Sequence, residues 1–500
     1  MSLAILQSRA QLGVTAPPVT IEVFLSGGLP KFSVVGLPEA AVRESKDRVR
    51  GAILSCEFEF PRGRITVSLG PADMRKTGGR FDLPIALGIL AAKKLVPMNR
   101  FGRFEFYGEL ALNGDIRPVP GVLPAAIKAA DAGHPIVVPK DNGAEAVLVP
   151  GEVYVANTLL EVTAFLRGTH GLESVEPAQE SVVMASAPDL ADVKGQRLAK
   201  RALEVAAAGR HNILFSGPPG TGKSMLAQRL AGILPPMNDA EAIETAAVDS
   251  VLGRPFDLAR WRQRPFRSPH HTASAVALVG GGSDPRPGEI SRAHNGVLFL
   301  DELPEFSRHV LEVLREPMES GWITISRAGR QADYPARFQL VAAMNPCPCG
   351  YLGDPAGDCH CSAERVQNYR GRISGPLLDR IDILMHVQRP PMASLRPDAP
   401  AEEASAEVSR RVTNARSIQL ERSGVCNADL SGNDLKEAFC AADETWILLH
   451  RAADKLALSA RAYQRVQRVA RTIADLAQEE IVGKHHLAEA LALRQFDRKF

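Results

Sequence analysis

The segment "GPPGTGKS" at residues 217–224 restricts the fold of this chain more than any other feature of its sequence. The apolar run "NILFS" precedes it and the helical pattern "MLAQRLAGIL" follows it, which is the strand, glycine-rich loop and helix of a P-loop. Such a loop turns backbone N–H groups toward phosphates, its lysine reaches the β- and γ-phosphate oxygens, and its serine supplies an oxygen to Mg²⁺. We therefore predict a nucleotide site formed by Gly217, Pro218, Pro219, Gly220, Thr221, Gly222, Lys223 and Ser224.

A second apolar run, "GVLFLDE" at residues 296–302, ends in two carboxylates. It is typical of a buried strand, and ligands bind at the carboxyl ends of the strands of a parallel sheet. We expect Asp301 to order the Mg²⁺ ion and Glu302 to polarise the attacking water. An acidic surface pair after a core strand is the alternative. With the P-loop, the pair predicts nucleotide hydrolysis.

Further polar residues follow the next strands. "FQLVAAMN" is interpreted as a third buried strand, and Asn345 at its end is expected to hold the same water. The segment "YRGRISGPLLDRIDI" then offers Arg370, Arg372 and Arg380. An arginine here is suited to reach the γ-phosphate of a neighbouring subunit. The alternative for Arg380 is a salt bridge with Asp379 or Asp382.

The length of the chain suggests several domains, because 500 residues are too many for one hydrophobic core. The amino-acid composition changes at two stretches. One is polar and has no hydrophobic period, and the other is rich in proline. Between them strands and helices alternate, which predicts a parallel sheet with covering helices. The predicted divisions are a first domain at 1–168, linkers at 169–188 and 389–405, a P-loop domain at 189–388 and a helical domain at 406–500. In the first domain, β-like runs are expected at 21–25, 65–69, 104–107 and 136–138.

The composition is that of an ordinary soluble protein, with 45% hydrophobic and 23% charged residues. No run of about 18 uncharged apolar residues occurs, and the first residues do not resemble a signal peptide. We expect a cytoplasmic protein without membrane association. The net charge of +2 is too small to indicate nucleic-acid binding by itself, so local basic elements must carry that argument.

Several long motifs carry a family resemblance. The P-loop is followed in order by "EISRAHNGVLFLDE", "AAMNPCPCG", "ISGPLLDRIDI" and "LSARAYQRVQRVARTIADL". With these motifs the chain resembles, over nearly its whole length, the AAA+ ATPases of the magnesium-chelatase-like group, and within it the ComM/YifB branch. The resemblance implies a homohexameric ring motor that uses ATP and Mg²⁺. It also implies that Arg380 is an arginine finger acting in trans and that Arg461, in a helical lid, is a second sensor contacting ATP.

Two stretches are candidates for pore elements. "GWITISRAGRQADYP" at 321–335 is interpreted as a hairpin whose turn carries Arg327 and Arg330. In similar helicases a hairpin at this position points into the central pore, so these arginines are expected to contact the DNA backbone. Exposed arginines on an ordinary surface hairpin are the alternative. The stretch 264–290 is expected to be a second pore element, with its adjacent histidines, His270 and His271, bonded to solvent or backbone.

The first domain resembles the Lon protease domain, which has the ribosomal S5 domain 2-like fold. Residues 73–90 and 107–133 carry this resemblance. Proteolysis in that fold needs a serine nucleophile and a lysine, but residues 76–83 contain no serine and Leu123 or a close neighbour stands at the lysine position. We expect an inactive scaffold that serves as a ring-stacking or DNA-binding collar. Arg75, Lys76 and Arg80 are its candidate DNA contacts, and a solvated basic face is the alternative.

Four of the seven cysteines lie together after Asn345: Cys347, Cys349, Cys359 and Cys361. Two C-x-C pairs closing a short loop rich in glycine and proline favour a tetrahedral structural Zn²⁺ site. Reduced free thiols and redox pairing are the alternatives. A zinc ion here is expected to brace the loop between the sensor and the arginine finger.

The expected fold class is α/β, with a Lon-protease-like domain, an AAA+ core and a helical lid. The expected function is a hexameric motor that moves along DNA. The resemblance further implies a helicase, acting on single-stranded and branched DNA with a recombinase, that promotes branch migration during natural transformation. The rivals are a chelatase-type motor that remodels a protein partner, an ATP-dependent protease, and a non-motor scaffold. A chelatase motor subunit is expected to lack the Lon-like domain, which argues against the first rival.

Overall fold

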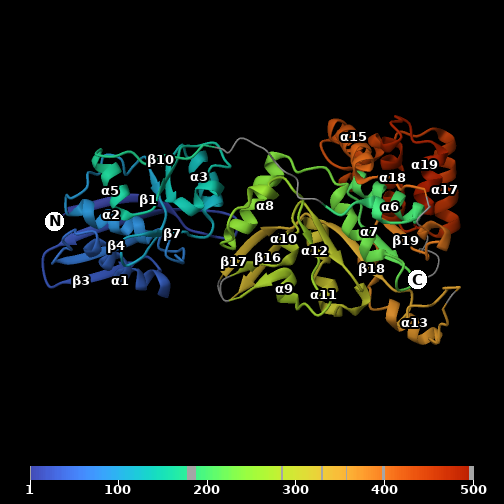
Figure 1. Cartoon of the computed structure of the whole chain (residues 1–500), viewed down its shortest axis with the longest axis horizontal. Helices are drawn as coiled ribbons and strands as arrows, with labels where there is room; N and C mark the ends of the chain where they lie inside the picture. The colour runs from blue at the N-terminus through green and yellow to red at the C-terminus, as the bar shows by residue number, and fades with distance from the viewer. Residues whose placement is uncertain are drawn as a thin grey trace.

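Runs of alternating and continuous apolar residues build two separate sheets, and helices cover them. The computed structural model describes residues 2–176, 187–282, 285–327, 330–355, 357–396 and 400–494. The N-terminal domain lies at one end of an elongated molecule, the P-loop domain in the middle and the C-terminal helices at the other end (Figure 1).

The N-terminal domain is a mixed sheet in the strand order β10-β9-β8-β5-β1-β2-β4-β3. Its strands are β1 (Ser2–Arg9), β2 (Pro18–Ser26), β3 (Lys31–Val35), β4 (Arg64–Gly70), β5 (Glu105–Phe106), β8 (Ile136–Pro139), β9 (Val153–Ala156) and β10 (Glu173–Ser174). The short β6 (Glu109–Leu110) and β7 (Ile116–Arg117) pair separately. The four β-like runs expected from the sequence are confirmed, since they fall on β2, β4, β5 and β8.

Helices cover this sheet. They are α1 (Ala40–Ser55), α2 (Asp82–Ala92), α3 (Val122–Asp131), α4 (Gly143–Ala146) and α5 (Leu159–Arg167). Helix α2 is buried at every residue and packs on β1 and β2, as its nearly continuous apolar sequence requires. Gly88 brings the helix close to the sheet, because a side chain at this position would meet Val23 and Leu6.

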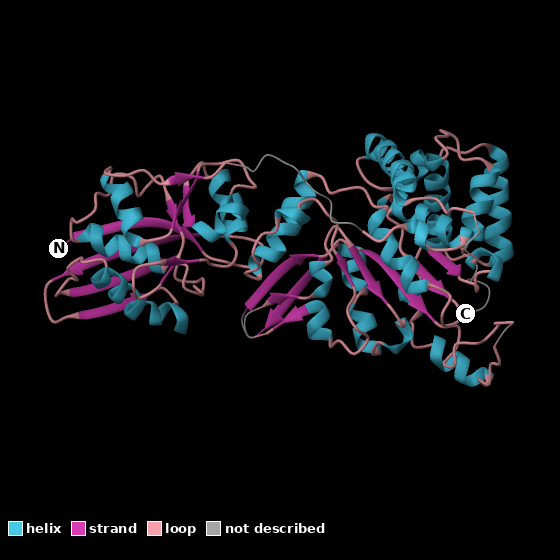
Figure 2. Ribbon diagram, viewed as in Figure 1, coloured by secondary structure: helices cyan, strands magenta, loops and turns pink. Residues whose placement is uncertain are grey.

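The P-loop domain is built on a fully parallel sheet in the order β12-β15-β18-β11-β19. Its strands are β11 (Ile213–Ser216), β12 (Phe266–Arg267), β15 (Val297–Leu300), β18 (Gln339–Met344) and β19 (Ile383–His386). Both faces are buried: Phe215 and Phe299 point into one apolar cluster, whereas Leu214 and Leu298 point into another. Helices lie on both faces (Figure 2), which confirms the predicted parallel sheet with covering helices.

The helices of this domain are α6 (Arg197–Gly209), α7 (Lys223–Arg229), α8 (Asp239–Val251), α9 (Ala275–Val279), α10 (Glu289–Arg292), α11 (Arg308–Val313), α12 (Arg315–Ser320), α13 (Ala363–Arg370) and α14 (Gly375–Leu378). Two insertions interrupt the alternation. One contains α9 and the pair β13 (Gly280–Gly281) and β14 (Arg286–Pro287), and the other is the hairpin of β16 (Trp322–Arg327) and β17 (Arg330–Pro335).

The C-terminal region is helical, as predicted. Its helices are α15 (Ser405–Ser423), α16 (Gly432–Ala438), α17 (Asp443–Leu456), α18 (Ala460–Leu476) and α19 (Lys484–Ala492). Both α15 and α18 pack on α6, so this region shares an apolar cluster with one face of the parallel sheet. None of the helices in the described residues has the length and apolar composition needed to cross a bilayer.

The N-terminal domain docks onto α8 of the P-loop domain. The Gly121 N–H donates to the Ser250 carbonyl at 2.8 Å, and the Leu123 N–H donates to Ser250 Oγ at 3.2 Å. Ser250 Oγ also bonds the carboxyl group of Glu145, whose pKa is raised by burial. Ala247 of α8 joins the apolar cluster around α3. The contact therefore combines apolar burial with satisfied polar groups.

The stretch interpreted as the first linker differs in part from that prediction. Glu173 and Ser174 form β10, which pairs antiparallel with β9 at the edge of the N-terminal sheet. A short polar edge strand of this kind has no apolar period by which a sequence could reveal it. Residues 177–186 of the predicted linker lie outside the described residues.

Candidate nucleotide site and its surroundings

The P-loop connects the carboxyl end of β11 to α7. Gly220 and Gly222 adopt left-handed conformations with φ of 75° and 89°, which residues with side chains rarely take. Lys223 Nζ donates to the Gly217 and Pro218 carbonyls at 2.7 and 2.9 Å. Burial lowers the pKa of Lys223 to about 8, although Asp301 and Glu302 act to raise it. A buried cation bonded to neutral oxygens suits an anionic ligand such as a phosphate.

The strand pairing brings the predicted acidic pair to the same edge of the sheet. Strand β18 separates β15 from β11, and all three end at this edge. Ser224 Oγ donates to Asp301 Oδ2 at 2.6 Å, so two hard oxygen ligands meet beside the P-loop. Glu302 takes a left-handed conformation with φ of 52°, and its side chain is half exposed. The Ser224 and Asp301 oxygens fit the ligand set of Mg²⁺.

Asn345 follows the end of β18, as expected. Its Oδ1 accepts a hydrogen bond from Lys223 Nζ at 3.1 Å, which links the third strand directly to the P-loop lysine. Lys223, Ser224, Asp301 and Asn345, predicted separately from three strands, thus form a polar group of two hydrogen-bonded pairs. The pairs Lys223–Asn345 and Ser224–Asp301 lie side by side because Lys223 and Ser224 are consecutive in the P-loop.

One residue at this site was not indicated by the sequence. His271, from the loop between β12 and α9, places Nδ1 3.2 Å from Glu302 Oε2. The neighbouring His270 lies 2.9 Å from the hydroxyl of Thr272. The expectation that both histidines bond solvent or backbone is confirmed for His270, which is exposed and accepts a hydrogen bond from the Thr272 N–H at 3.4 Å. It is wrong for His271, which contacts the Glu302 side chain. Nothing in the sequence gives the distance between residues 271 and 302, so only the folded sheet reveals this contact.

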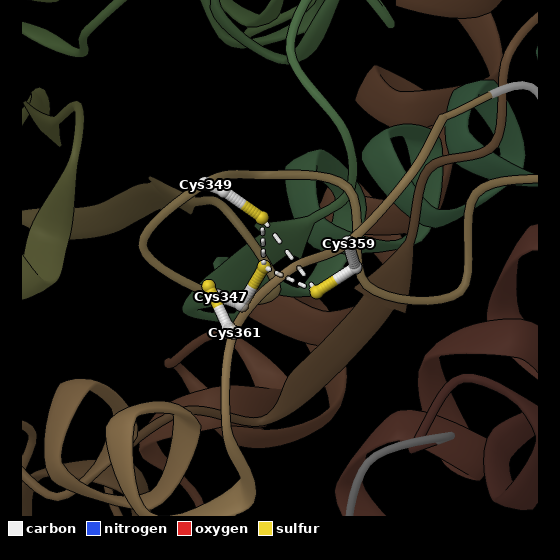
Figure 3. A group of neighbouring side chains, drawn as sticks. All are labelled: Cys347, Cys349, Cys359 and Cys361. Carbon is white, nitrogen blue, oxygen red and sulfur yellow. Dashed lines mark hydrogen bonds between the residues drawn. The ribbon is translucent and has the colours of Figure 1, made fainter.

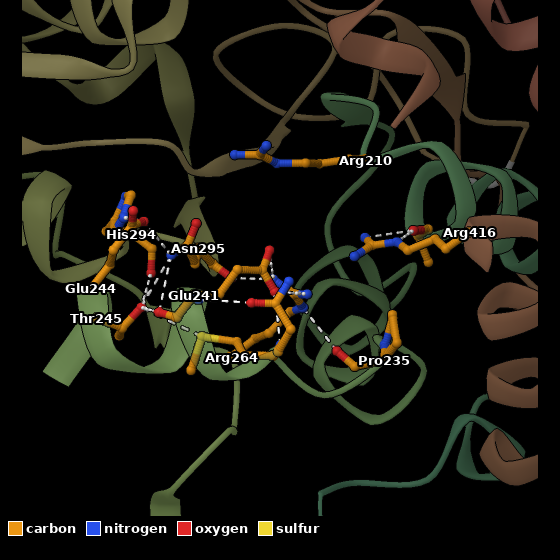
Figure 4. Close-up of polar contacts among 12 residues, drawn as sticks. Arg210, Pro235, Glu241, Glu244, Thr245, Arg264, His294, Asn295 and Arg416 are labelled. Atoms are coloured by element: carbon orange, nitrogen blue, oxygen red, sulfur yellow. Dashed lines mark hydrogen bonds and ion pairs between the residues drawn. The ribbon is translucent and has the colours of Figure 1, made fainter. Parts of the chain in front are cut away.

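The other end of β15 is fixed to α8 by a polar network (Figure 4). His294 Nε2 lies 3.0 Å from Glu244 Oε2, and Asn295 Nδ2 donates to the Glu241 carbonyl at 3.2 Å. Arg264 joins the same network, since Nη2 pairs with Glu241 Oε2 at 2.8 Å and Nη1 donates to the Asn295 carbonyl at 2.7 Å. The helix that holds the N-terminal domain therefore also holds the strand that ends in Asp301 and Glu302.

Arg380 and Arg461 share one carboxylate. Arg380 is buried and bonds Glu319 of α12, and Arg461 Nη2 lies 3.7 Å from Glu319 Oε1. The alternative salt bridge of Arg380 with Asp379 or Asp382 is not the one observed, because Asp382 pairs with Arg465 at 2.8 Å. Burial acts to raise the pKa of Asp382, but Arg465 and His211 hold it well below its usual range.

The other two arginines of this segment bond residues of two loops that precede it in the chain. Arg370 Nε donates to the Pro346 carbonyl at 3.1 Å. Arg372 Nη1 donates to the Pro304 carbonyl at 3.1 Å and pairs with Glu305 at 3.0 Å. Arg370 therefore binds the loop that follows β18, and Arg372 binds the loop that follows β15.

The hairpin predicted between Asp301 and Asn345 is present, and its strands are longer than expected. Arg327 and Arg330 are the last paired residues of β16 and β17 and do not lie in the turn. Residues 328–329 and the side chains of these two arginines lie outside the described residues.

Two of the three basic residues proposed as DNA contacts in the N-terminal domain are buried, so that prediction is wrong for them. Lys76 donates to the Pro71 and Met74 carbonyls, and Arg80 bonds the Pro120 carbonyl. Burial lowers the pKa of Arg80 to about 10. Arg75 is exposed. Leu123, which with its close neighbours is expected at the lysine position of a protease, is fully buried against the α8 contact.

The cysteine-rich loop lies directly beside the P-loop. A side chain on Gly350 would approach Pro219 within 2.8 Å, so the two loops are in contact. The Sγ atom of Cys347 is 3.3 Å from that of Cys349 and 3.7 Å from that of Cys359, and the Cys349 to Cys359 distance is 3.6 Å. The four side chains, including Cys361, point into one small space (Figure 3).

Comparisons with known proteins place this arrangement in a family. Residues 189–395 match a family model described as magnesium chelatase, subunit ChlI. Residues 402–494 match the C-terminal part of that subunit, and residues 21–142 match a model described as subunit ChlI of Mg-chelatase.

Among curated proteins, the chain is 51% identical to the competence protein ComM of Haemophilus influenzae over 100% of this chain and 98% of ComM. It is 49% identical to the Escherichia coli protein YifB, again over 100% of this chain and 98% of that protein. The 38 kDa magnesium-chelatase subunit of Cereibacter sphaeroides is 30% identical over 31% of this chain and 51% of the subunit. Similarity to ComM and YifB thus extends over all domains.

Proposed function

We infer the function from a family membership: the chain belongs to the magnesium-chelatase-like family of ComM and YifB, and we propose that it is a DNA motor driven by ATP hydrolysis. The observation that carries the proposal is the polar group of Lys223, Ser224, Asp301 and Asn345 at the carboxyl ends of three parallel strands. This is where the ligands of open α/β sheets bind.

Each residue of the group has a role in hydrolysis. The N–H groups of the P-loop and Lys223 hold the β- and γ-phosphates of ATP. Ser224 and Asp301 would hold Mg²⁺, which when bound supplies positive charge to the phosphate oxygens. Glu302 accepts a proton from the attacking water, and Asn345 orients that water from the side of Lys223. His271 holds Glu302 through their 3.2 Å contact until the substrate is in place.

Arg380 is proposed to complete the site of a neighbouring subunit. It precedes β19, whereas the P-loop follows β11, the parallel neighbour of β19. Arg380 and the P-loop of the same chain therefore lie at opposite ends of the parallel strands, separated by the length of a four-residue strand, about 13 Å. Arg380 thus has no route to its own P-loop, and a ring in which it reaches the next γ-phosphate gives this buried cation a function. We propose a homohexamer, as the family resemblance implies.

DNA is proposed to pass through the centre of this ring. The β16 and β17 hairpin extends from the P-loop domain, and its end carries Arg327 and Arg330. Two arginines at the end of a hairpin are suited to bind the sugar-phosphate backbone without reading sequence. The α9 insertion, which carries His271 at its start, is the second proposed pore element.

The N-terminal domain is proposed to be an inactive Lon-protease-like collar. Residues 76–83 contain no serine, and we place buried Leu123 or a close neighbour where the lysine would be needed. Its docking onto α8 gives it a structural role at the ring. An ATP-dependent protease is therefore not the function that we propose.

Within this class, we propose that the motor promotes branch migration of recombination intermediates in natural transformation, together with a recombinase. The support is the full-length similarity to a protein named as a competence protein. A chelatase-type motor acting on a protein partner is the second candidate, because the matching family models describe a chelatase subunit. The N-terminal match removes the argument that such subunits lack this domain, so the preference rests on the full-length relatives.

The test is steady-state ATP hydrolysis by the purified chain with and without single-stranded and branched DNA. We expect stimulation by DNA in the wild type and no hydrolysis by Lys223→Ala. The variant Arg327→Ala/Arg330→Ala is expected to keep basal hydrolysis and lose stimulation. Its matched control, Arg103→Ala/Arg451→Ala, removes the same charge at exposed positions outside the hairpin and should behave as wild type.

Strand-exchange intermediates with a labelled branch give the second readout. ATP-dependent movement of the branch supports the helicase. Hydrolysis that no DNA stimulates, together with an immobile branch, would refute the DNA motor and favour a protein partner.

A further inference from the structure

The four clustered cysteines have the geometry of a site for one metal ion. Their Sγ atoms all lie within 4.8 Å of one another, and three of the separations are 3.3, 3.6 and 3.7 Å. A tetrahedral ion with Zn–S bonds of about 2.3 Å places its sulfur ligands about 3.8 Å apart. The observed separations are close to that value.

Other states of the thiols fit this geometry less well. The separations are far longer than a disulfide bond of about 2.0 Å, and all seven cysteines are free. In an iron–sulfur cluster the four thiolates are divided among two or four iron atoms, so those on different iron atoms stand farther apart than ligands of one ion. A tetrahedral set of four sulfur ligands around a single ion is characteristic of structural zinc.

The segment also needs an ordering element that its own residues do not supply. Between Asn345 and Ser362 the described residues form neither a helix nor a strand. Cys347 is fully buried, and the other three cysteines are half-buried, so the centre of this loop consists of sulfur atoms. A bound metal supplies the free energy that an apolar core supplies elsewhere.

The cluster is connected to the nucleotide site by short paths. Cys347 is two residues from Asn345, which bonds Lys223. The intervening Pro346 carbonyl accepts a hydrogen bond from Arg370, and Gly350 packs against Pro219 of the P-loop. On the far side, buried Asp354 pairs with Arg389 at 2.9 Å. A ligand that holds the four sulfur atoms in place therefore also restrains the backbone of the neighbouring Asn345.

We propose that Cys347, Cys349, Cys359 and Cys361 bind one Zn²⁺ ion, and that this site holds Asn345 against Lys223 and supports the P-loop. Zinc binding by the four cysteines is inferred from the sulfur geometry alone. The support of Asn345 and the P-loop rests on the proposed ATP hydrolysis. Zinc here is structural, since four protein ligands leave no open position for a substrate.

The first experiment measures metal content by mass spectrometry in protein purified without chelators or a metal-affinity step. We expect one zinc per chain in the wild type and loss of zinc in Cys359→Ser/Cys361→Ser. The matched control Cys426→Ser/Cys440→Ser changes two cysteines outside the cluster and should keep its zinc. No metal in the wild type, iron in place of zinc, or zinc retained by the cluster variant would overturn the site.

Replacement of the metal by Co²⁺ in the wild type gives a readout that does not depend on the folding of a variant. The intense absorption of a tetrahedral cobalt–thiolate site is expected, and its absence would also overturn the proposal.

The supporting role is tested by separating turnover from binding. In Cys359→Ser/Cys361→Ser we expect kcat for ATP to fall about tenfold or more, as for loss of a hydrogen bond to a charged group, while a fluorescent ATP analogue still binds. An unchanged kcat with zinc lost would refute the support of Asn345. If DNA fails to stimulate hydrolysis, the DNA motor fails while the zinc result stands.

Discussion

The protonation of Lys223 makes ATP binding dependent on pH in a way that can be calculated. Burial lowers the pKa of this lysine to about 8 in the free protein. Bound phosphates stabilise the ammonium group and raise its pKa, so binding above pH 8 requires the uptake of a proton. The cation is about 90% populated at pH 7 and about 10% at pH 9, and the dissociation constant for ATP is therefore expected to rise about tenfold over this interval.

Stability of the nucleotide-free protein should change in the opposite direction. The pKa of Lys223 is lower in the folded chain than in the unfolded chain, so the unfolded chain binds more protons between about pH 8 and 10.5. In this range the Lys223 contribution raises the free energy of unfolding as pH increases. Weaker ATP binding at pH 9 would thus occur without loss of fold from this group.

Fluorescence titration with an ATP analogue between pH 7 and 9 measures the effect. Lys223→Arg is the control, because its guanidinium group stays charged over the whole range, and its affinity should be independent of pH whatever its absolute value. A wild-type affinity that is constant from pH 7 to 9, in protein shown to be folded, would refute the reasoning.

Four further substitutions test the contacts around the site. Glu302→Gln should lower kcat by about 10²-fold or more while ATP still binds, whereas His271→Ala should raise basal kcat up to about fivefold, because an exposed pair is worth at most about 1 kcal/mol; a lower rate in the histidine variant would contradict a restraining role. Arg380→Ala and Glu302→Gln should each be inactive alone, and mixing them should restore part of the hydrolysis, since mixed interfaces contain one intact half from each chain; no recovery would argue against action in trans. Ser250→Val leaves Leu123 and Glu145 without their shared partner and should cost about 1–3 kcal/mol in urea unfolding, whereas Ser250→Thr keeps the hydroxyl and should not.

The residues that the sequence predicts well are those at strand ends. A buried strand has a clear apolar pattern, and the polar residue that follows it must lie at the sheet edge, so the grouping of Ser224, Asp301 and Asn345 follows from local patterns and the parallel order. The close spacing of the four cysteines in sequence likewise predicts their closeness in space.

Residues whose environment depends on distant segments could not be predicted in this way. Lys76 and Arg80 belong to a basic stretch that suggests a solvated face, yet their charged ends bond carbonyl groups inside the domain. The partner of Arg380 is Glu319, which is 61 residues away, and not one of the adjacent aspartates. The residue types define the charge of these side chains, but their spacing in the sequence does not define the direction in which they point.

The shared position of Arg380 and Arg461 leads to a final prediction. Both arginines contact Glu319, so Arg461 lies at the edge of the sheet opposite its own P-loop. An arginine acting as a second sensor from this position serves the nucleotide of the next subunit, alongside Arg380, and not the nucleotide of its own chain. We therefore expect inactive Arg461→Ala to recover hydrolysis when mixed with Glu302→Gln, as Arg380→Ala does. Arg451→Ala, an exposed change on the neighbouring α17, should be active without mixing. If Arg461→Ala is inactive and mixing fails while the Arg380→Ala mixture recovers, the lid must turn during the cycle and bring Arg461 to its own ATP.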